Sequence, residues 1–139
     1  MAGATTAGEE GVVAEGGASE MAVSRKLGGR EFFEKVLKSP KYCVAPMVNA
    51  SELPFRMMCR KYGADMAWTP MFHSKMFLDS EGYRAKQFTT CPEDRPLAVQ
   101  FCGNDPDTLL GAALLVQDQC DVVDINFGCP QGIAKRGNY

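Results

Sequence analysis

The feature that most constrains the fold is a short strand that ends in a cysteine-bearing loop. Residues 122–126 are Val-Val-Asp-Ile-Asn, and residues 127–130 are Phe-Gly-Cys-Pro. The first run is typical of a short buried strand. Gly128 and Pro130 end it, because glycine adopts backbone angles closed to other residues and proline cannot donate to a strand ladder. Ligands of α/β folds bind at the carboxyl ends of strands, so Cys129 is the first candidate for chemistry.

Three earlier apolar runs predict further strands, and periodic segments between them predict helices. The strands are expected at residues 42–45, 66–68 and 97–100. Helices are expected at residues 30–38, packed on the end of the domain, between Ser51 and Gly63, and from Pro106 onward. Residues 70–78 are expected to be helical, and residues 79–94 irregular. Because the strands are apolar on both faces, they predict a parallel sheet covered by helices.

The two longer helices have predicted inner faces. For the helix that starts after Asn49 or Ser51 as its cap, Arg56, Arg60 and Lys61 are predicted to face solvent, and the inner face is Leu53, Met57, Met58, Cys59 and Tyr62. The helix at Pro106 is predicted to be capped by Asn104 or Asp105, with an inner face of Leu109, Leu110, Ala113, Leu114 and Gln117.

The order of elements favours a barrel over other α/β folds. No GxGxxG follows the first strand and no GxxxxGK[ST] occurs, so a dinucleotide-binding sheet and a P-loop are disfavoured. A (β/α)₈ TIM barrel typically needs about 250 residues, and four predicted strands are half of one. Residues 25–139 are therefore predicted to be the N-terminal half of a TIM barrel, in a chain that is a fragment.

Residues 1–24 are rich in Ala, Gly and Glu and are predicted to be a disordered tail. A transit peptide is the alternative. Transit peptides are rich in Arg and poor in acid, whereas this segment has four Glu and its first Arg comes at position 25. The composition therefore favours the tail.

The cysteines and the charge exclude several classes. Six cysteines occur without CxxC spacing, and His73 is the only histidine, so no metal site is predicted. No secretory signal and no apolar run of membrane length occurs, which predicts reduced thiols, no membrane partner, and a cytoplasmic protein with the nucleus as a second compartment. A net charge of −2 is not the footprint of a strongly basic nucleic-acid binder.

Polar groups gather where the predicted strands end. They are Pro46-Met47-Val48, Thr69-Pro70, Gln100, Asn126 and Cys129. This set contains amides, a thiol and loop backbone, which suit a flat heterocycle such as a flavin or a nucleobase. It contains no carboxylate pair, so it fits redox chemistry better than hydrolysis. For Gln100, an amide satisfied by neighbouring backbone is the alternative. His73 is interpreted as a satisfied histidine beside a helix.

Several blocks carry a resemblance to a known family. Residues 45–56 (APMVNASELPFR), 96–100 (PLAVQ) and 124–130 (DINFGCP), supported by 91–96 and 131–139, resemble the tRNA-dihydrouridine synthases. They are most similar to the eukaryotic branch that acts on positions 16 and 17 of the D-loop. The resemblance runs from about Lys41 to Tyr139. It implies an FMN-dependent barrel followed by a helical tRNA-binding domain, of which this chain would hold only the first half-barrel.

The resemblance also implies roles for individual residues. Cys129 matches the proton donor, Asn126 the amide that touches flavin and the flipped uracil, and Gln100 the group at the isoalloxazine edge. Flavin-holding loop residues would be Pro46, Met47 and Val48. Independently of the resemblance, Lys135 and Arg136 follow Cys129 in its loop and are candidates to meet RNA phosphate, although a solvated pair of charges is the slightly favoured alternative. These correspondences predict FMN, NADPH or NADH, and tRNA as ligands.

The implied reaction reduces uridine to 5,6-dihydrouridine. NADPH reduces FMN, the flavin gives hydride to uracil C6, and Cys129 protonates C5 after the base is extruded. An ordinary thiol, with a pKa of about 8.5, is protonated at neutral pH and still able to transfer its proton. We expect the 139-residue chain alone to be inactive and to bind FMN weakly or not at all. The alternatives are a non-catalytic truncated product and another FMN barrel that reduces a free pyrimidine, such as a dihydropyrimidine or dihydroorotate oxidoreductase.

Overall fold

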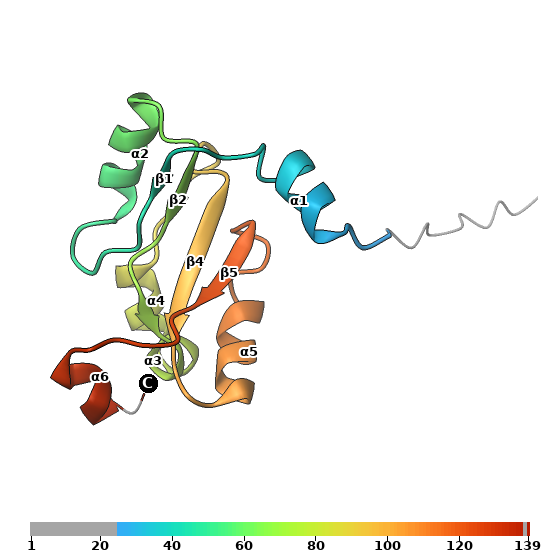
Figure 1. The fold of residues 1–139 in the computed structure, drawn as a ribbon. Helices are drawn as coiled ribbons and strands as arrows, with labels where there is room; N and C mark the ends of the chain where they lie inside the picture. Colours follow the sequence, from blue (N-terminus) through green and yellow to red (C-terminus); the bar gives the residue numbers. More distant parts are fainter. Residues whose placement is uncertain (1–24, 138) are drawn as a thin grey trace, which may run out of the picture.

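The computed structural model describes residues 25–137 and 139, so the predicted tail at residues 1–24 lies outside the described residues. Helices and strands alternate along the chain (Figure 1). In chain order they are α1 (Gly29–Lys35), β1 (Cys43–Val44), α2 (Leu53–Lys61), β2 (Met66–Trp68), β3 (Phe72–His73), α3 (Ser74–Asp79), α4 (Glu81–Gln87), β4 (Leu97–Cys102), α5 (Pro106–Leu114), β5 (Val122–Ile125) and α6 (Gly132–Gly137).

The strands form one parallel sheet, as predicted, with β4 at its centre. On one edge of β4 lies β5, in a register that pairs Gln100 with Asp124. The other edge is shared by β2, which pairs at Leu97, and β3, which pairs at Phe101. Since β2 and β3 follow one another along the same edge, the five strands fill four positions, β1, β2 with β3, β4 and β5.

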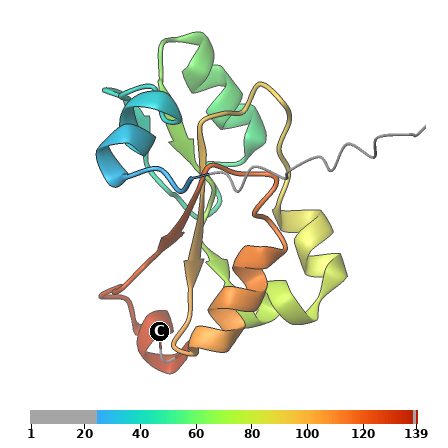
Figure 2. The ribbon, with the colours of Figure 1, turned by 90° about the vertical axis from the view of Figure 1, so that its right-hand side faces the viewer.

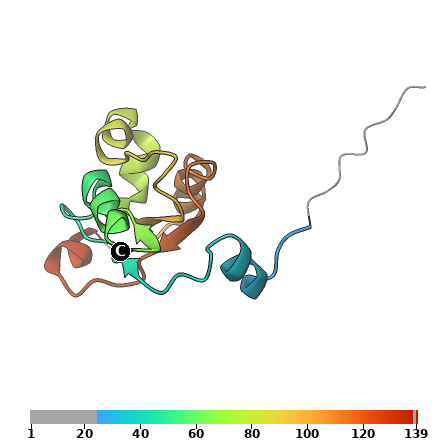
Figure 3. The same cartoon turned by 90° about the horizontal axis from the view of Figure 1, so that it is seen from above.

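The two faces of β4 differ in chemistry. All six residues of this strand are buried, which fits its continuous apolar run. Figures 2 and 3 show α4 and α5 together on one side of the strands. That side holds the hydrophobic core, formed by Phe72, Phe77, Leu97, Val99, Phe101, Ala112, Val116 and Cys120. Burying a side chain such as Phe101 contributes roughly 1.5–3 kcal/mol. The opposite face carries Gln100 and Cys102, because side chains alternate along a strand.

The predicted inner face of α2 is wrong, because an arginine is buried and two of the predicted core residues are exposed. Arg56 is 1% exposed, whereas the predicted core residues Met58 and Tyr62 are 50% and 80% exposed. The reason is Asp94, a buried carboxylate that accepts from Arg56 Nη2 at 2.6 Å and from Arg60 Nε at 3.1 Å. The ion pairs turn the arginine side of the helix inward.

The ends of the helices also differ in part from the prediction. For α2 the N-cap is Glu52 without a side-chain hydrogen bond, so neither Asn49 nor Ser51 caps it. Helix α5 begins at Pro106 with Asp105 as its cap, and the Asp105 side chain accepts from the backbone N–H of Thr108 at 2.7 Å. The cap of α5 is therefore confirmed.

Four segments depart from their expected structure. Residues 70–78 form β3 and then α3, and the stretch expected to be irregular contains α4, whose N-cap Ser80 accepts from Tyr83 N at 3.2 Å. Helix α1 has no buried residue and stands away from the sheet in Figure 3, so it does not pack on the domain. In α5, Leu110 and Leu114 are more than half exposed, and the buried residue is Ala112.

Candidate active site

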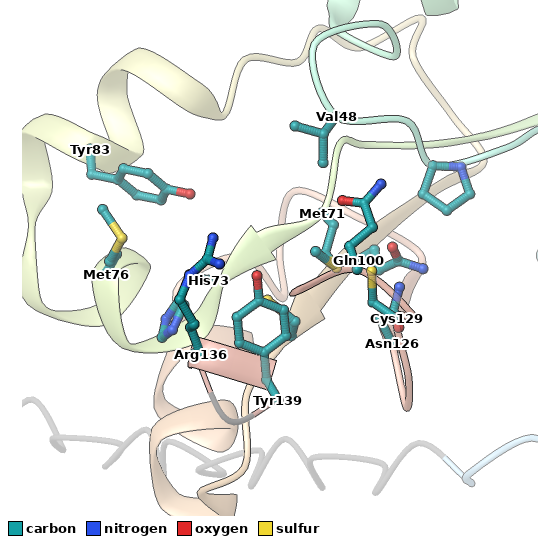
Figure 4. A pocket seen from close by; sticks show the side chains of 14 residues that line it. Val48, Met71, His73, Met76, Tyr83, Gln100, Asn126, Cys129, Arg136 and Tyr139 are labelled. Carbon is teal, nitrogen blue, oxygen red and sulfur yellow. The ribbon is translucent and has the colours of Figure 1, made fainter. Parts of the chain in front are cut away.

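A pocket of about 740 Å³ lies at the carboxyl ends of the strands (Figure 4). Its size is within the usual range for small-molecule sites, about 300–1,000 Å³. Every strand position of the sheet contributes to it, directly or through the loop that follows. The lining residues are Pro46, Val48, Met71, His73, Met76, Tyr83, Gln100, Cys102, Asn126, Cys129, Gln131, Arg136, Gly137 and Tyr139.

The loop after β1 is held in a fixed shape by Ser51. Its hydroxyl accepts from the backbone N–H of Met47 at 3.0 Å and donates to the Met47 carbonyl at 3.1 Å. The turn also needs Asn49 at φ 59°, a region that Asn tolerates better than most residues. Pro46 and Val48 line the pocket, whereas Met47 is not among the lining residues. Of the three predicted loop residues, the structure therefore brings two to the pocket.

The sequence predicts Gln100 at the end of its strand. In the structure β4 continues to Cys102, so Gln100 lies within the strand. Its backbone N–H donates to Thr69 Oγ1 at 3.2 Å, and its side-chain Nε2 donates to Asp124 Oδ2 at 2.7 Å. The same carboxylate oxygen accepts from Trp68 Nε1 at 3.1 Å. The side-chain N–H of Gln100 is thus bound by a carboxylate and not by neighbouring backbone.

Asn126 and Cys129 come to the pocket from the loop after β5. The backbone N–H of Asn126 donates to the Phe101 carbonyl at 2.9 Å, which anchors the loop to β4. Its Oδ1 accepts from the Gly128 N–H at 3.0 Å and shapes the turn that carries Cys129. In Figure 4, Gln100, Asn126 and Cys129 lie together at one end of the pocket, as the sequence predicted.

The two basic residues after Cys129 have different places. Both lie in α6, a helix that the sequence did not predict. Arg136 lines the pocket, and Figure 4 shows it beside His73 and Tyr139. Lys135 lines a neighbouring groove of about 350 Å³ together with Asn126 and Phe127. Phe127 is 95% exposed. The structure therefore brings one of the two basic residues into the pocket and places the other outside it.

Sequence reasoning missed the far end of the pocket, where Met76 and Tyr83 lie (Figure 4). Tyr83 comes from α4, which was expected to be irregular, and burial raises the pKa of its phenol. His73 was expected to be satisfied beside a helix. It is the last residue of β3, its ring lies 5.4 Å from that of Tyr139, and its buried Nδ1 has no hydrogen-bond partner among the described residues. The Ser80 cap of α4 is the local signal that could have indicated Tyr83, whereas Met76 and His73 have no such signal.

The second pocket thiol gives a pH-dependent prediction. Burial raises the pKa of Cys102 to about 11. The folded state holds this proton more tightly than the unfolded chain, so the free energy of unfolding falls as pH rises through the window from 9 to about 11. We expect Cys102→Ala to remove this part of the pH dependence. The measurement is the urea midpoint of both proteins across that window.

The matched control is Cys43→Ala, because Cys43 is an exposed thiol. It should keep the wild-type pH profile, since an exposed thiol is hydrated before and after unfolding. If the urea midpoints of wild type and Cys102→Ala changed in parallel with pH, burial would not raise the pKa of this thiol.

Within the part of the chain that the structure describes, no group of three His, Cys, Asp or Glu side chains is arranged to hold a metal ion. Among the same residues, no helix is both long enough and apolar enough to cross a bilayer.

A parallel α/β sheet with its pocket at the carboxyl ends of the strands is the arrangement of the ligand-binding α/β folds, which include the (β/α)₈ barrels. Residues 43–139 match the family model described as "Dihydrouridine synthase (Dus)". The chain belongs to the dihydrouridine synthase family. The fold of this family is the TIM barrel, and the four strand positions seen here form part of one.

The curated relatives cover most of this chain and only part of their own length. The chain is 55% identical over 118 residues to the Schizosaccharomyces pombe protein named tRNA-dihydrouridine(16/17) synthase [NAD(P)(+)], covering 84% of this chain and 29% of the relative. A Saccharomyces cerevisiae protein of the same name is 53% identical, with 85% and 28% covered. A mouse tRNA-dihydrouridine(20a/20b) synthase-like protein is 46% identical, with 71% and 30% covered. The chain thus spans about 30% of the length of such relatives.

Proposed function

We propose that the whole protein to which this chain belongs reduces uridine to 5,6-dihydrouridine in the D-loop of tRNA, at positions 16 and 17. The observation that supports this most is the grouping of Cys129, Gln100 and Asn126 at one end of the pocket. A thiol beside two amides can protonate and orient a flat ring. Relatives that are more than 50% identical to the chain carry the name tRNA-dihydrouridine(16/17) synthase, which supports a uridine in tRNA as the substrate.

The pocket fits FMN in volume and chemistry. Its 740 Å³ is large enough for a ring system of this kind, Val48 and Met71 offer apolar surface for the faces of a flat ring, and Gln100 offers an amide for its edge. We assign the cofactor to this end, held by the loop of Pro46 and Val48. FMN bound here and reduced by NADPH or NADH would supply the hydride, and the name NAD(P)(+) in two relatives supports a nicotinamide reductant.

Cys129 is the residue that we assign to proton transfer. Reduction of the uracil 5,6 double bond adds a hydride at C6 and a proton at C5, and the thiol of Cys129 gives up the proton. The resulting thiolate regains a proton from solvent, because Cys129 is only half-buried. We assign the orientation of the uracil to Asn126, and its position in the pocket lining together with Cys129 supports this role. General acid catalysis of this kind contributes typically about 10²–10⁴-fold to a rate.

Access of tRNA to this site is supported by the basic residues of α6. We assign contact with tRNA phosphate to Arg136, which lines the pocket, and to the exposed Lys135, which lines the neighbouring groove. We further infer a cytoplasmic protein, with the nucleus as a second compartment. The six free cysteines support a reducing compartment of this kind.

Mapping of dihydrouridine in cellular tRNA tests the proposal. In cells that lack the full-length gene, we expect dihydrouridine at positions 16 and 17 to be lost while it persists at other D-loop positions. A plasmid-borne wild-type gene should restore it. Dihydrouridine that stays at positions 16 and 17 in the deletion strain would overturn the assignment. Purified protein that reduces free pyrimidines but not tRNA would favour a small-molecule oxidoreductase instead.

A further inference from the structure

Three side chains from neighbouring strands meet on the open face of the sheet, opposite the hydrophobic core. Asp124 on β5 uses one carboxylate oxygen, Oδ2, to accept from Gln100 Nε2 on β4 at 2.7 Å and from Trp68 Nε1 on β2 at 3.1 Å. The strand order β2-β4-β5 places Gln100 between the other two. We call these three residues the Asp124 clamp.

The clamp settles which way round the Gln100 amide lies. A carboxylate accepts hydrogen bonds and donates none, whereas an amide has one donor end and one acceptor end. An amide turned the other way would place its oxygen 2.7 Å from Asp124 Oδ2 with no hydrogen between them. The N–H end is therefore committed to Asp124, and the free group is the acceptor, Oε1. Among residues 25–137 and 139, none donates a hydrogen bond to Gln100 Oε1.

We infer that Asp124 is a positioning residue that makes Gln100 a dedicated acceptor, and that this acceptor selects ligands with an imide N–H. Gln100 is 7% exposed and lines the pocket, so its oxygen meets whatever ring binds there. An imide, an N–H between two carbonyls, is the chemistry that flavin and uracil share. A ring nitrogen with a lone pair, such as N3 of cytosine, would place two acceptors against each other and leave both unpaired.

Without Asp124, the amide of Gln100 would be free to turn over and present its N–H to the pocket. The site would then accept an imide and a lone-pair nitrogen more evenly. Selection depends on this orientation. A site whose hydrogen-bonding group is fixed strongly rejects a ligand that leaves this group unpaired, whereas a site whose group can turn over rejects it much less. The choice of flavin and uracil as ligands rests on the proposed function, whereas the clamp itself does not.

The first experiment tests the clamp on the 139-residue chain without any ligand. Trp68 is the only tryptophan, so its indole N–H gives a single assignable NMR signal. We expect the indole proton and one Gln100 side-chain amide proton to move upfield in Asp124→Ala, because each loses a carboxylate acceptor. Asp118→Ala removes an exposed aspartate and is the matched control; it should move neither signal. If both signals stayed in place in Asp124→Ala, the clamp would be disproved.

A second variant keeps the test decisive if Asp124→Ala does not fold. Asp124→Asn retains one oxygen that can occupy the Oδ2 position, so the Gln100 amide should keep its orientation while its proton shifts by less. Trp68→Phe leaves the bond between Asp124 and Gln100 intact and should preserve the Gln100 signal. If the Gln100 amide proton moved upfield in Trp68→Phe as it does in Asp124→Ala, Asp124 would not be its acceptor.

The second experiment tests selection in the full-length protein with two pairs of ligands, followed by NMR titration. FMN is compared with N3-methyl-FMN, and uridine with 3-methyluridine, since each methyl group removes the imide N–H. For the imide that Gln100 reads, methylation should weaken binding to wild type about ten-fold or more, the cost of an unpaired buried acceptor. In Asp124→Asn that penalty should persist, and in Asp124→Ala it should fall to about two-fold or less.

The outcomes separate this inference from the proposed function. A penalty in the FMN pair assigns the acceptor to flavin, and a penalty in the uridine pair assigns it to the substrate. Loss of FMN binding with a surviving uridine penalty would count against the flavin proposal and still support the clamp. Equal binding of methylated and unmethylated ligands, or no binding of either parent ligand, would overturn the selection of imides, whatever the dihydrouridine content of cellular tRNA.

Discussion

Replacing Asp94 by Ala should lower the free energy of unfolding by about 3–5 kcal/mol, the range for breaking a buried ion pair by removing one partner. Asp94 is 0% exposed and Arg56 is 1% exposed, so the guanidinium cannot recover the lost interaction from water. Asp94 Oδ2 accepts from Arg56 Nε at 2.9 Å and from Nη2 at 2.6 Å, and Oδ1 accepts from Arg60 Nε. The expected loss is a large part of the 5–15 kcal/mol that holds an ordinary domain together.

Urea unfolding of the 139-residue chain measures this effect, with Asp79→Ala as the control. Asp79 also pairs with a cation, Lys75 at 2.9 Å, but both side chains are more than half exposed. Its replacement should leave the urea midpoint nearly unchanged, because exposed ion pairs are screened by water. Equal effects of the two substitutions would show that burial gives the Asp94 pairs no special weight. If Asp94→Ala does not fold, the milder Arg60→Lys should still lower the midpoint, because Arg60 also donates to the Pro96 carbonyl at 2.7 Å.

The Asp94 ion pairs also connect to the pocket through the loop after β1. Arg56 Nη1 donates to the Ser51 carbonyl at 2.7 Å, and Ser51 in turn holds both backbone polar groups of Met47. Pro46 and Val48 on either side of Met47 line the pocket. The stability of the buried ion pairs and the shape of the loop that we assign to the cofactor therefore depend on the same residue, Arg56.

The sequence predicts β1, β2, β4 and β5 because their signals are local, but it misses β3 and ends β4 at Gln100 instead of Cys102. The apolar runs that became β2, β4 and β5 are bounded by residues that cannot extend a ladder, and Asp105 before Pro106 is a cap that needs no distant partner. The parallel arrangement follows from strands that are apolar on both faces. The same logic brought Gln100, Asn126 and Cys129 to one pocket, since carboxyl ends of parallel strands share an edge.

What the sequence could not predict depends on residues far apart along the chain. Arg56 was expected at the surface because its partner, Asp94, is 38 residues away. The orientation of Gln100 depends on Asp124, which is 24 residues away. For α4 a local signal existed, the Ser80 cap, but Gly82 in the first turn weakens a helical pattern. Missing α4 removed Tyr83 from the predicted site.

Replacing Cys129 by Ala in the full-length protein should lower the rate of dihydrouridine formation about 10²–10⁴-fold, the usual contribution of a positioned general acid. Cys129 is half-buried in a loop, so the substitution should leave flavin binding and the urea midpoint close to wild type. Cys129→Ser separates shape from acidity. A hydroxyl fills nearly the same space as a thiol and is a far weaker acid, so Ser should be nearly as inactive as Ala.

The matched control for this prediction is Cys43→Ser, which changes an exposed thiol outside the pocket and should keep full activity. The measurement is single-turnover reduction of tRNA by protein whose flavin has been reduced beforehand, which isolates proton transfer from the nicotinamide step. Cys102→Ala provides a sharper comparison, because Cys102 is the second thiol of the pocket and burial raises its pKa to about 11, which makes it a poor proton donor. A Cys129→Ala protein as fast as wild type, together with an inactive Cys102→Ala protein, would transfer the role of acid to Cys102. Full activity in both would remove the thiols from the mechanism.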